Sequence, residues 1–181
     1  MNIPNLLTIL RILLVPVVVW AISQGQMGWA LAGFVIAGVT DGIDGYIAKH
    51  FDQRTELGAY LDPLADKTLI VSIYVSLAIF GFIPPWVAIL VVSRDFMIVG
   101  AVLLSTLMGN PLVIQPLYIS KANTAAQILF ATLVLASLGL KLDLAWPVTI
   151  VMWLVAVLTL ASAAAYLVAW TRHMSTPGAG S

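Results

Sequence analysis

Hydrophobic residues occur in long runs that are separated by short stretches of glycine, proline and charged residues. A membrane-spanning helix needs roughly 20 consecutive, mostly apolar residues, and six segments of about this length can be marked along the chain. The pattern therefore predicts an all-α integral membrane protein with six transmembrane helices. The expected helices cover residues 6–23, 27–50, 58–81, 84–108, 120–140 and 146–170.

The connections between these segments are short. Residues 24–26, 82–85 and 141–144 are expected to form tight hairpins, and the two longer polar stretches are 50–57 and 109–119. None of them is long enough for a soluble domain, so residues 1–174 are expected to form a single domain, followed by a short polar tail at 175–181. The start of the chain lacks a basic leader and Arg11 interrupts its apolar run, so we interpret residues 1–23 as a retained first helix rather than a signal peptide.

The composition agrees with a membrane protein and excludes several kinds of site. Hydrophobic residues make up 61% of the 181 residues and charged residues only 9%, against about 25% in soluble domains. The formal net charge is zero, so no general positive field favours binding to nucleic acid. The chain has no cysteine and two histidines, which excludes thiolate chemistry and disfavours a zinc site with several histidines.

The basic residues predict the orientation of the chain. Cytoplasmic loops and helix ends are enriched in lysine and arginine. Lys141 falls on one side of the expected bundle, and the other basic residues near helix ends fall on the opposite side: Arg11, Lys49, Arg54, Lys121 and Arg172. With six spans, both termini are then expected to be cytoplasmic.

Two acidic pairs interrupt the second and third apolar segments. Six of the eight acidic residues lie between positions 41 and 66. Asp41 and Asp44 are three residues apart, and Asp62 and Asp66 are four apart, so each pair shares one face of a helix. Because the two helices are antiparallel and closely connected, the four carboxylates can converge at one depth. A charge in a bilayer costs several kcal/mol unless it is paired, hydrated or bound to metal, so we expect this cluster to have a function.

The chemistry expected of four converging carboxylates is the binding of hard cations. Two divalent ions would offset their formal charge, and a set of oxygen ligands without Cys or convergent His favours Mg²⁺ or Mn²⁺. Such ions bridge diphosphate oxygens and stabilise charge on a leaving phosphate. If three aspartates hold metal, the fourth could accept a proton from an attacking hydroxyl.

Two other interpretations of the acidic cluster remain open. The aspartates could form ion pairs with Lys49, Arg54 and Lys67, although burying four acids for stability alone is unfavourable. They could instead line an ion or proton pathway, as in a transporter. Transport sites usually lie near the bilayer midplane, whereas these acids are predicted to lie near one membrane face.

The spacing of the acids resembles a known signature. The pattern Asp41-x2-Asp44-Gly45-x2-Ala48-Lys49-x8-Gly58-x3-Asp62-x3-Asp66 is similar to that of the CDP-alcohol phosphotransferase family. One position departs, because Lys49 stands where the family has arginine; lysine keeps the charge but cannot bind phosphate in a bidentate manner.

The resemblance implies a six-helix membrane fold, commonly homodimeric, and two divalent cations, Mg²⁺ or Mn²⁺. It implies that Asp41, Asp44 and Asp62 are metal ligands and that Asp66 is the general base or a further ligand. It also implies a nucleotide pocket shaped by a set of neighbouring positions, which are Gly45, Ala48, Lys49 and Gly58. The reaction would be attack of an acceptor hydroxyl on the CDP-activated lipid phosphate, with release of CMP.

Other stretches bear on the acceptor. Residues 3–11 and 61–67 resemble both phosphatidylglycerophosphate synthases and cardiolipin synthases of this family, whereas 92–95 and 119–127 are more similar to the cardiolipin synthases. The preferred interpretation is therefore transfer from CDP-diacylglycerol to phosphatidylglycerol in a bacterial cytoplasmic membrane, with the active site on the cytoplasmic side. The alternative acceptor is glycerol 3-phosphate, and the alternative class is the transporter.

Three further polar groups are candidates for substrate binding. Arg94, deep in the fourth apolar segment, needs a partner. It either forms an ion pair with Asp95 or the aspartate cluster, or it binds a phosphate of the acceptor or the donor. Asp95 points about 100° away from it on a helix, which disfavours a direct pair between these neighbours. Lys121 either snorkels to the interface or binds the same phosphate. Asn5, Thr8 and Arg11 share a helix face and either reach the nucleotide or anchor the first helix.

Overall fold

The structure is a computed structural model that describes residues 3–50, 56–107 and 118–175, with side chains described at 8–43, 67–101, 103–105, 107 and 118–172. Every secondary-structure element in these ranges is an α-helix. The helices are α1 (Ile3–Ser23), α2 (Met27–His50), α3 (Glu56–Ile79), α4 (Pro85–Leu107), α5 (Tyr118–Gly139) and α6 (Ala145–Ser175). All six expected helices are confirmed, and the largest difference is at the end of α6, which continues to Ser175 rather than to residue 170.

Three of these helices are long and apolar enough to cross a membrane, by length and composition. Among the described residues they are the segments Pro85–Ser105, Tyr118–Gly139 and Ala145–Arg172. The other helices hold shorter apolar stretches, which are Thr8–Ser23, Met27–Ile43 and Lys67–Ile79. These stretches are limited to the described side chains, which begin at Thr8 in α1, end at Ile43 in α2 and begin at Lys67 in α3. The count of six spans and the cytoplasmic termini therefore remain predictions.

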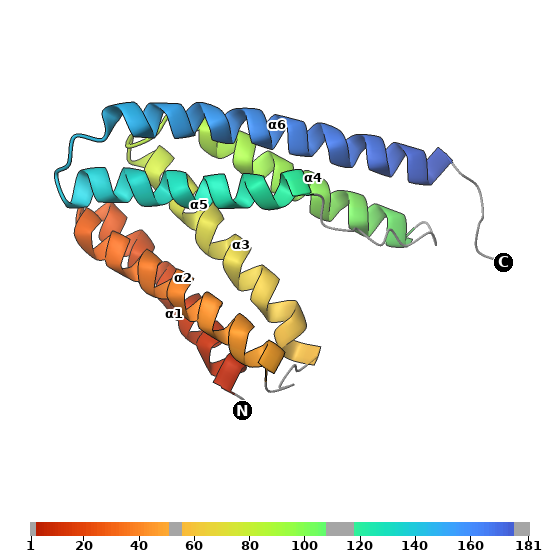
Figure 1. Cartoon of the computed structure of the whole chain (residues 1–181), viewed down its shortest axis with the longest axis horizontal. Coiled ribbons are helices and arrows are strands. Elements are labelled where there is room, and N and C mark those ends of the chain that lie inside the picture. The colour runs from red at the N-terminus through yellow and green to blue at the C-terminus, as the bar shows by residue number, and fades with distance from the viewer. Residues whose placement is uncertain (1–2, 51–55, 108–117, 176–181) are drawn as a thin grey trace.

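The helices form two groups joined by α3. Helix α6 packs against both α5 and α4, while Figure 1 shows α1 and α2 as a pair inclined to them. Helix α3 packs against α1 on one side and α4 and α5 on the other, and α2 also contacts α5. The end of α2 and the start of α3 lie at the same end of the molecule as the N-terminus (Figure 1). The fold thus brings the two acidic segments to one end.

The core lies where α3 and α5 meet their neighbours. Ile73, Tyr74 and Leu77 of α3 and Phe130 and Leu135 of α5 are fully buried. Large hydrophobic side chains are also exposed on the outward faces of all the helices. A helix that is apolar on every side is typical of a membrane span, because its outer face contacts lipid. The bundle is therefore held by packing between faces that are as apolar as those outside.

The three expected hairpins are confirmed, and each is closed by the same type of backbone hydrogen bond. In each, an amide donates to the carbonyl five residues earlier: Gln26 to Ala21 (2.8 Å), Phe82 to Leu77 (2.8 Å) and Leu142 to Ser137 (3.1 Å). The residue before each of these amides has a positive φ, and these residues are Gly25 (68°), Gly81 (76°) and Lys141 (54°). This arrangement satisfies carbonyls at the helix end and turns the chain sharply.

Two glycines allow a backbone contact between α2 and α5. A Cβ added at Gly139 would lie 2.8 Å from the backbone nitrogen of Gly28, whereas one at Gly28 would lie 3.8 Å from the Gly139 carbonyl oxygen. A Cβ at Gly38 or Gly42 would meet no described atom within 4 Å. Helix α2 packs closely on α1 at Gly33, where a Cβ would lie 2.7 Å from Val18 Cγ2.

This asymmetry predicts different effects for two matched substitutions. Gly139→Ala is expected to lower the free energy of unfolding by about 1–3 kcal/mol, because the new methyl group meets backbone that cannot move aside. Gly28→Ala is expected to be nearly neutral, because its methyl group is at ordinary contact distance. Thermal unfolding of both variants in the same detergent measures the difference, and equal midpoints would contradict the close approach of α2 and α5.

Candidate active site

Asp41 of α2 forms an ion pair with Arg11 of α1. Arg11 Nη2 lies 3.0 Å from Asp41 Oδ1, the Arg11 side chain is 1% exposed, and that of Asp41 is 48% exposed. An arginine within an apolar helix normally faces the bundle interior and a partner, which is what Arg11 does. The sequence interpretation named Lys49, Arg54 and Lys67 as possible partners for the acids and missed Arg11. The signal was present in the sequence, as the charge that interrupts the first apolar run.

The same face of α1 continues toward its N-terminus. Thr8, one turn before Arg11, is fully buried, so this face is directed into the molecule rather than toward lipid. The side chain of Asn5, the third member of the face, lies outside the described residues. Thr8 and Arg11 are therefore placed beside the acidic end of α2, as the nucleotide-binding hypothesis requires.

The other acidic residues are placed by the backbone alone. Asp44 lies on α2 three residues after Asp41, and Asp62 and Asp66 lie on the first half of α3. Their side chains fall outside the described residues, as do those of the other signature positions, Ala48 and Lys49, and the positions Gly45 and Gly58. Because α2 and α3 both pack against α1 and their acidic segments lie at one end of the molecule, the fold is compatible with one shared site (Figure 1).

The described side chains hold one oxygen ligand of the expected metal site, Asp41, and no group of three or more acidic or histidine side chains gathers among them. Asp41 supplies a carboxylate that is half exposed and hence accessible to an ion. Its contact with Arg11 fixes its orientation, and carboxylates that bind metals are commonly held by such a second partner. Oxygen is also the donor type that Mg²⁺ and Mn²⁺ prefer. Arg11 is therefore a positioning residue for Asp41.

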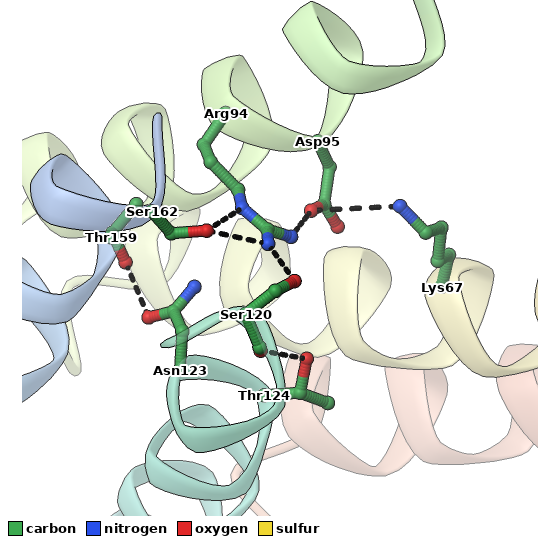
Figure 2. Close-up of polar contacts among 8 residues, drawn as sticks. All are labelled: Lys67, Arg94, Asp95, Ser120, Asn123, Thr124, Thr159 and Ser162. Atoms are coloured by element: carbon green, nitrogen blue, oxygen red, sulfur yellow. Dashed lines mark hydrogen bonds and ion pairs between the residues drawn. The ribbon is translucent and has the colours of Figure 1, made fainter. Parts of the chain in front are cut away.

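A second polar centre surrounds Arg94 of α4, whose side chain is only 5% exposed. Figure 2 shows its guanidinium between three helices. Nε and Nη2 donate to Ser162 Oγ of α6 at 3.2 and 2.8 Å, Nη2 also donates to Ser120 Oγ of α5, and Nη1 lies 2.6 Å from Asp95 Oδ1. The centre of the Tyr166 ring lies 5.7 Å from the guanidinium carbon of Arg94. Arg94 thus links α4 to both α5 and α6.

Asp95 extends this network to α3. Its Oδ1 atom lies 3.6 Å from Lys67 Nζ as well as 2.6 Å from Arg94 (Figure 2). The sequence argument against a direct Arg94–Asp95 pair was wrong, because the long arginine side chain bends back and overcomes the angle between neighbouring residues. Lys67, expected to neutralise Asp66, has Asp95 as its described ion-pair partner.

One turn further along α5, a polar layer continues inside the bundle. Thr159 Oγ1 of α6 donates to Asn123 Oδ1 at 2.9 Å, and Tyr74 OH donates to the backbone oxygen of Gln127 at 3.0 Å. Both amide side chains are buried, and Asn123 Nδ2 and Gln127 Nε2 have no acceptor among the described residues. Residues 119–127 were noted in the sequence only for their resemblance to the cardiolipin synthases, although Ser120, Asn123 and Gln127 have the spacing of one helix face.

Lys121 follows Ser120 but has a different environment. It is exposed, and its Nζ lies 5.8 Å from the centre of the Tyr118 ring. An exposed ammonium next to the Arg94–Ser120 contact remains accessible to an anionic group.

A family model matches nearly the whole chain. The model is described as CDP-alcohol phosphatidyltransferase, and it matches residues 1–169. The match includes all four aspartates, the six helices up to residue 169, and both polar centres.

Relatives of two kinds are similar to this chain. The human protein named cardiolipin synthase (CMP-forming) is 40% identical over 152 residues, which are 75% of this chain and 50% of the relative, and the rat protein of the same name is 39% identical over the same shares. The Bacillus subtilis protein named CDP-diacylglycerol--glycerol-3-phosphate 3-phosphatidyltransferase is 35% identical over 144 residues, 71% of this chain and 73% of the relative. The chain spans about half the length of the mammalian relatives. With the family model covering residues 1–169, the chain belongs to the CDP-alcohol phosphatidyltransferase family.

Proposed function

We propose that the chain transfers a phosphatidyl group from CDP-diacylglycerol to phosphatidylglycerol, forming cardiolipin and CMP. The observation that carries this proposal is the 40% identity to a protein named cardiolipin synthase (CMP-forming), within a family whose signature acids this chain retains. The Bacillus subtilis relative supports a second candidate, in which glycerol 3-phosphate is the acceptor. Family membership argues against the cation or proton transporter.

The acidic end of α2 and α3 supplies the proposed chemistry. Asp41, Asp44 and Asp62 would hold two divalent cations, Mg²⁺ or Mn²⁺, and Asp66, four residues after Asp62 on α3, would be a further ligand or the base. The cations, when bound, would stabilise negative charge on the diphosphate. Asp66 is the proposed general base, which accepts the proton of the attacking acceptor hydroxyl. Arg11 keeps the Asp41 carboxylate in place.

The nucleotide is proposed to lie against the remaining signature positions. Glycine and alanine there leave room for close approach of the cytidine and its phosphates, and Lys49 adds a positive charge without the bidentate geometry of arginine. Thr8, which is buried, and Asn5, which shares its face of α1 by spacing, are proposed to complete this pocket. The proposed nucleotide-binding residues are Asn5, Thr8, Gly45, Ala48, Lys49 and Gly58.

Arg94 and Lys121 are proposed to serve the acceptor's phosphate in different ways. All three guanidinium nitrogens of Arg94 already have partners in Ser162, Ser120 and Asp95. Direct binding by Arg94 would therefore use a remaining Nη1 hydrogen or displace a serine. Lys121 is exposed and can bind without such a loss. The proposal also includes a homodimer in a bacterial cytoplasmic membrane, with the acidic end on the cytoplasmic side.

The test is the release of CMP by the purified protein with CDP-diacylglycerol and Mg²⁺ or Mn²⁺. Phosphatidylglycerol and glycerol 3-phosphate are offered in parallel, and the lipid product is identified by mass spectrometry. We expect CMP and cardiolipin with phosphatidylglycerol. CMP formed only with glycerol 3-phosphate would select the second candidate, and proteoliposomes that move ions without any CDP-lipid would select the transporter.

A further inference from the structure

Two hollows lie along the seam between α3 and α4. The first has a volume of about 320 Å³ and is lined by Lys67, Val71 and Ser72 of α3 and by Asp95, Phe96 and Val99 of α4. The second has a volume of about 420 Å³ and is lined by Val75, Ala78 and Ile79 of α3 and by Ala88, Ile89 and Val92 of α4. Both volumes fall in the range of ligand pockets, roughly 300–1,000 Å³.

The two hollows follow one another along the same seam. Ser72 lines the first and Val75 the second, one turn apart on α3; Asp95 and Val92 have the same relation on α4. Together they extend along α3 from Lys67 to Ile79, or about 18 Å at 1.5 Å per residue. One leaflet of the hydrocarbon core is about 15 Å thick. This groove, the α3/α4 groove, therefore has the length of one acyl chain.

The α3/α4 groove has a charged end and an apolar end. Among its described lining residues, Lys67 and Asp95 carry the charges, and both lie in the first hollow. Arg94 holds Asp95 at 2.6 Å, whereas Lys67 lies 3.6 Å away and its side chain is 42% exposed (Figure 2). Asp95 thus has a closer partner than Lys67, and the lysine is accessible to an anionic head group. The groove has the charge pattern of a phospholipid: a phosphate at Lys67 and a chain toward Ile79.

We propose that the α3/α4 groove holds one acyl chain of the phosphatidylglycerol acceptor and that Lys67 binds its phosphate. This inference rests on the proposed function. The acceptor is favoured over the donor because Asp95 connects the charged end to Arg94 and Ser120, next to Lys121, the proposed residues for the acceptor's phosphate. Glycerol 3-phosphate has no acyl chain, so the groove would select the lipid acceptor.

Binding can be tested independently of turnover. Wild-type protein is illuminated with a phosphatidylglycerol that carries a diazirine in one acyl chain, and the labelled residues are mapped by mass spectrometry. We expect labels on α3 and α4 between Lys67 and Ile79 and between Ala88 and Val99, and we expect excess phosphatidylglycerol to remove them. Labels removed by CDP-diacylglycerol alone would assign the groove to the donor and overturn the proposal. Labels removed by neither lipid, or absent there, would assign the groove to bulk lipid or to a second copy of the chain and also overturn it.

Turnover supplies the second test. Ser72→Phe places a ring in the middle of the groove, and Ala32→Phe places one on an exposed face of α2 as the matched control. Because lipid surrounds the groove anyway, its apolar contacts act by positioning the acceptor rather than by hydrophobic gain. We expect Ser72→Phe to lower kcat/KM for phosphatidylglycerol by about ten- to a hundredfold and to leave the KM for CDP-diacylglycerol unchanged. We expect Ala32→Phe to change neither quantity.

A third variant addresses the phosphate. Lys67→Gln is expected to raise the KM for phosphatidylglycerol about tenfold. Lys67→Arg is expected to keep this KM close to the wild-type value, because the positive charge is retained. An increase confined to the KM for CDP-diacylglycerol in Ser72→Phe or Lys67→Gln, or no change in either, would overturn the proposal. Failure of the proposed function is seen separately, as wild-type protein that forms CMP only with glycerol 3-phosphate.

Discussion

Asp66→Asn is expected to lower the rate of CMP release by about 10²–10⁴-fold while the protein stays folded. A general base contributes a factor of this size by taking the proton of the attacking hydroxyl, and an amide cannot accept that proton. The substitution keeps the shape of the side chain, so α3 has no steric reason to move. Asp66 precedes Lys67, whose described ion-pair partner is Asp95, so that contact between α3 and α4 does not depend on the Asp66 carboxylate.

The measurement compares this variant with one that has the same change elsewhere. Asp143→Asn lies in the exposed turn between α5 and α6, at the hairpin end of the bundle, and is expected to retain wild-type turnover. Both variants are assayed for CMP release at saturating CDP-diacylglycerol, and Mn²⁺ binding is followed by electron paramagnetic resonance. We expect Asp66→Asn to retain part of the Mn²⁺ binding through the other three acids. Turnover within a few-fold of wild type would remove Asp66 as the base, and complete loss of Mn²⁺ binding would make it primarily a metal ligand.

The helices could be predicted from the sequence because each signal is local. An apolar run bounded by glycine, proline or charge defines a helix in a membrane protein without knowledge of its neighbours. The hairpins at Gly25 and Gly81 follow the same logic, since glycine readily adopts the positive φ that ends these helices. The third hairpin was also predicted, but the positive φ of its Lys141 was not, because a residue with a side chain rarely adopts it.

The partners of the charged residues could not be predicted in the same way. The sequence shows that Arg11, Arg94 and Asp41 need partners, because a charge in a membrane helix is costly alone. It does not show that Arg11 reaches Asp41 on the next helix or that Arg94 reaches Ser162 on α6. Those choices depend on which helix faces meet, and α1 to α6 are apolar on nearly every face, so periodicity does not identify the inward one.

The two polar centres connect different helices of the bundle. The Arg11–Asp41 pair lies on α1 and α2, whereas the Arg94 network joins α3, α4, α5 and α6 through Lys67, Asp95, Ser120 and Ser162. Since α3 carries both Asp66 and Lys67, it is the helix through which the relative position of the two groups is fixed. The Arg94 network is thus expected to determine where the acceptor's binding groups stand relative to the acidic site.

Removal of Arg94 is expected to have the largest effect on stability of any single substitution considered for this chain. Arg94→Met keeps much of the side-chain volume but leaves Asp95 with Lys67 as its described ion-pair partner and takes a shared donor from Ser120 and Ser162. Breaking a buried ion pair by removing one partner costs about 3–5 kcal/mol, because the remaining charge stays buried. Arg94→Lys is expected to recover only part of this loss, since an ammonium cannot reproduce the planar fork that serves α4, α5 and α6 together.

Equilibrium unfolding in mixed micelles measures this prediction, with Arg172→Met at the exposed end of α6 as the control for loss of an arginine. The control is expected to change the free energy of unfolding by less than about 1 kcal/mol. The same samples are assayed for the KM of phosphatidylglycerol, which separates the two roles of Arg94. If Arg94→Met unfolded like wild type but raised this KM strongly, Arg94 would be a phosphate ligand and the links to Ser120 and Ser162 would be incidental. If stability falls in Arg94→Met and returns partly in Arg94→Lys, its first role is to hold α4, α5 and α6 in register, and Lys121 and Lys67 remain the accessible cations for the acceptor's phosphate.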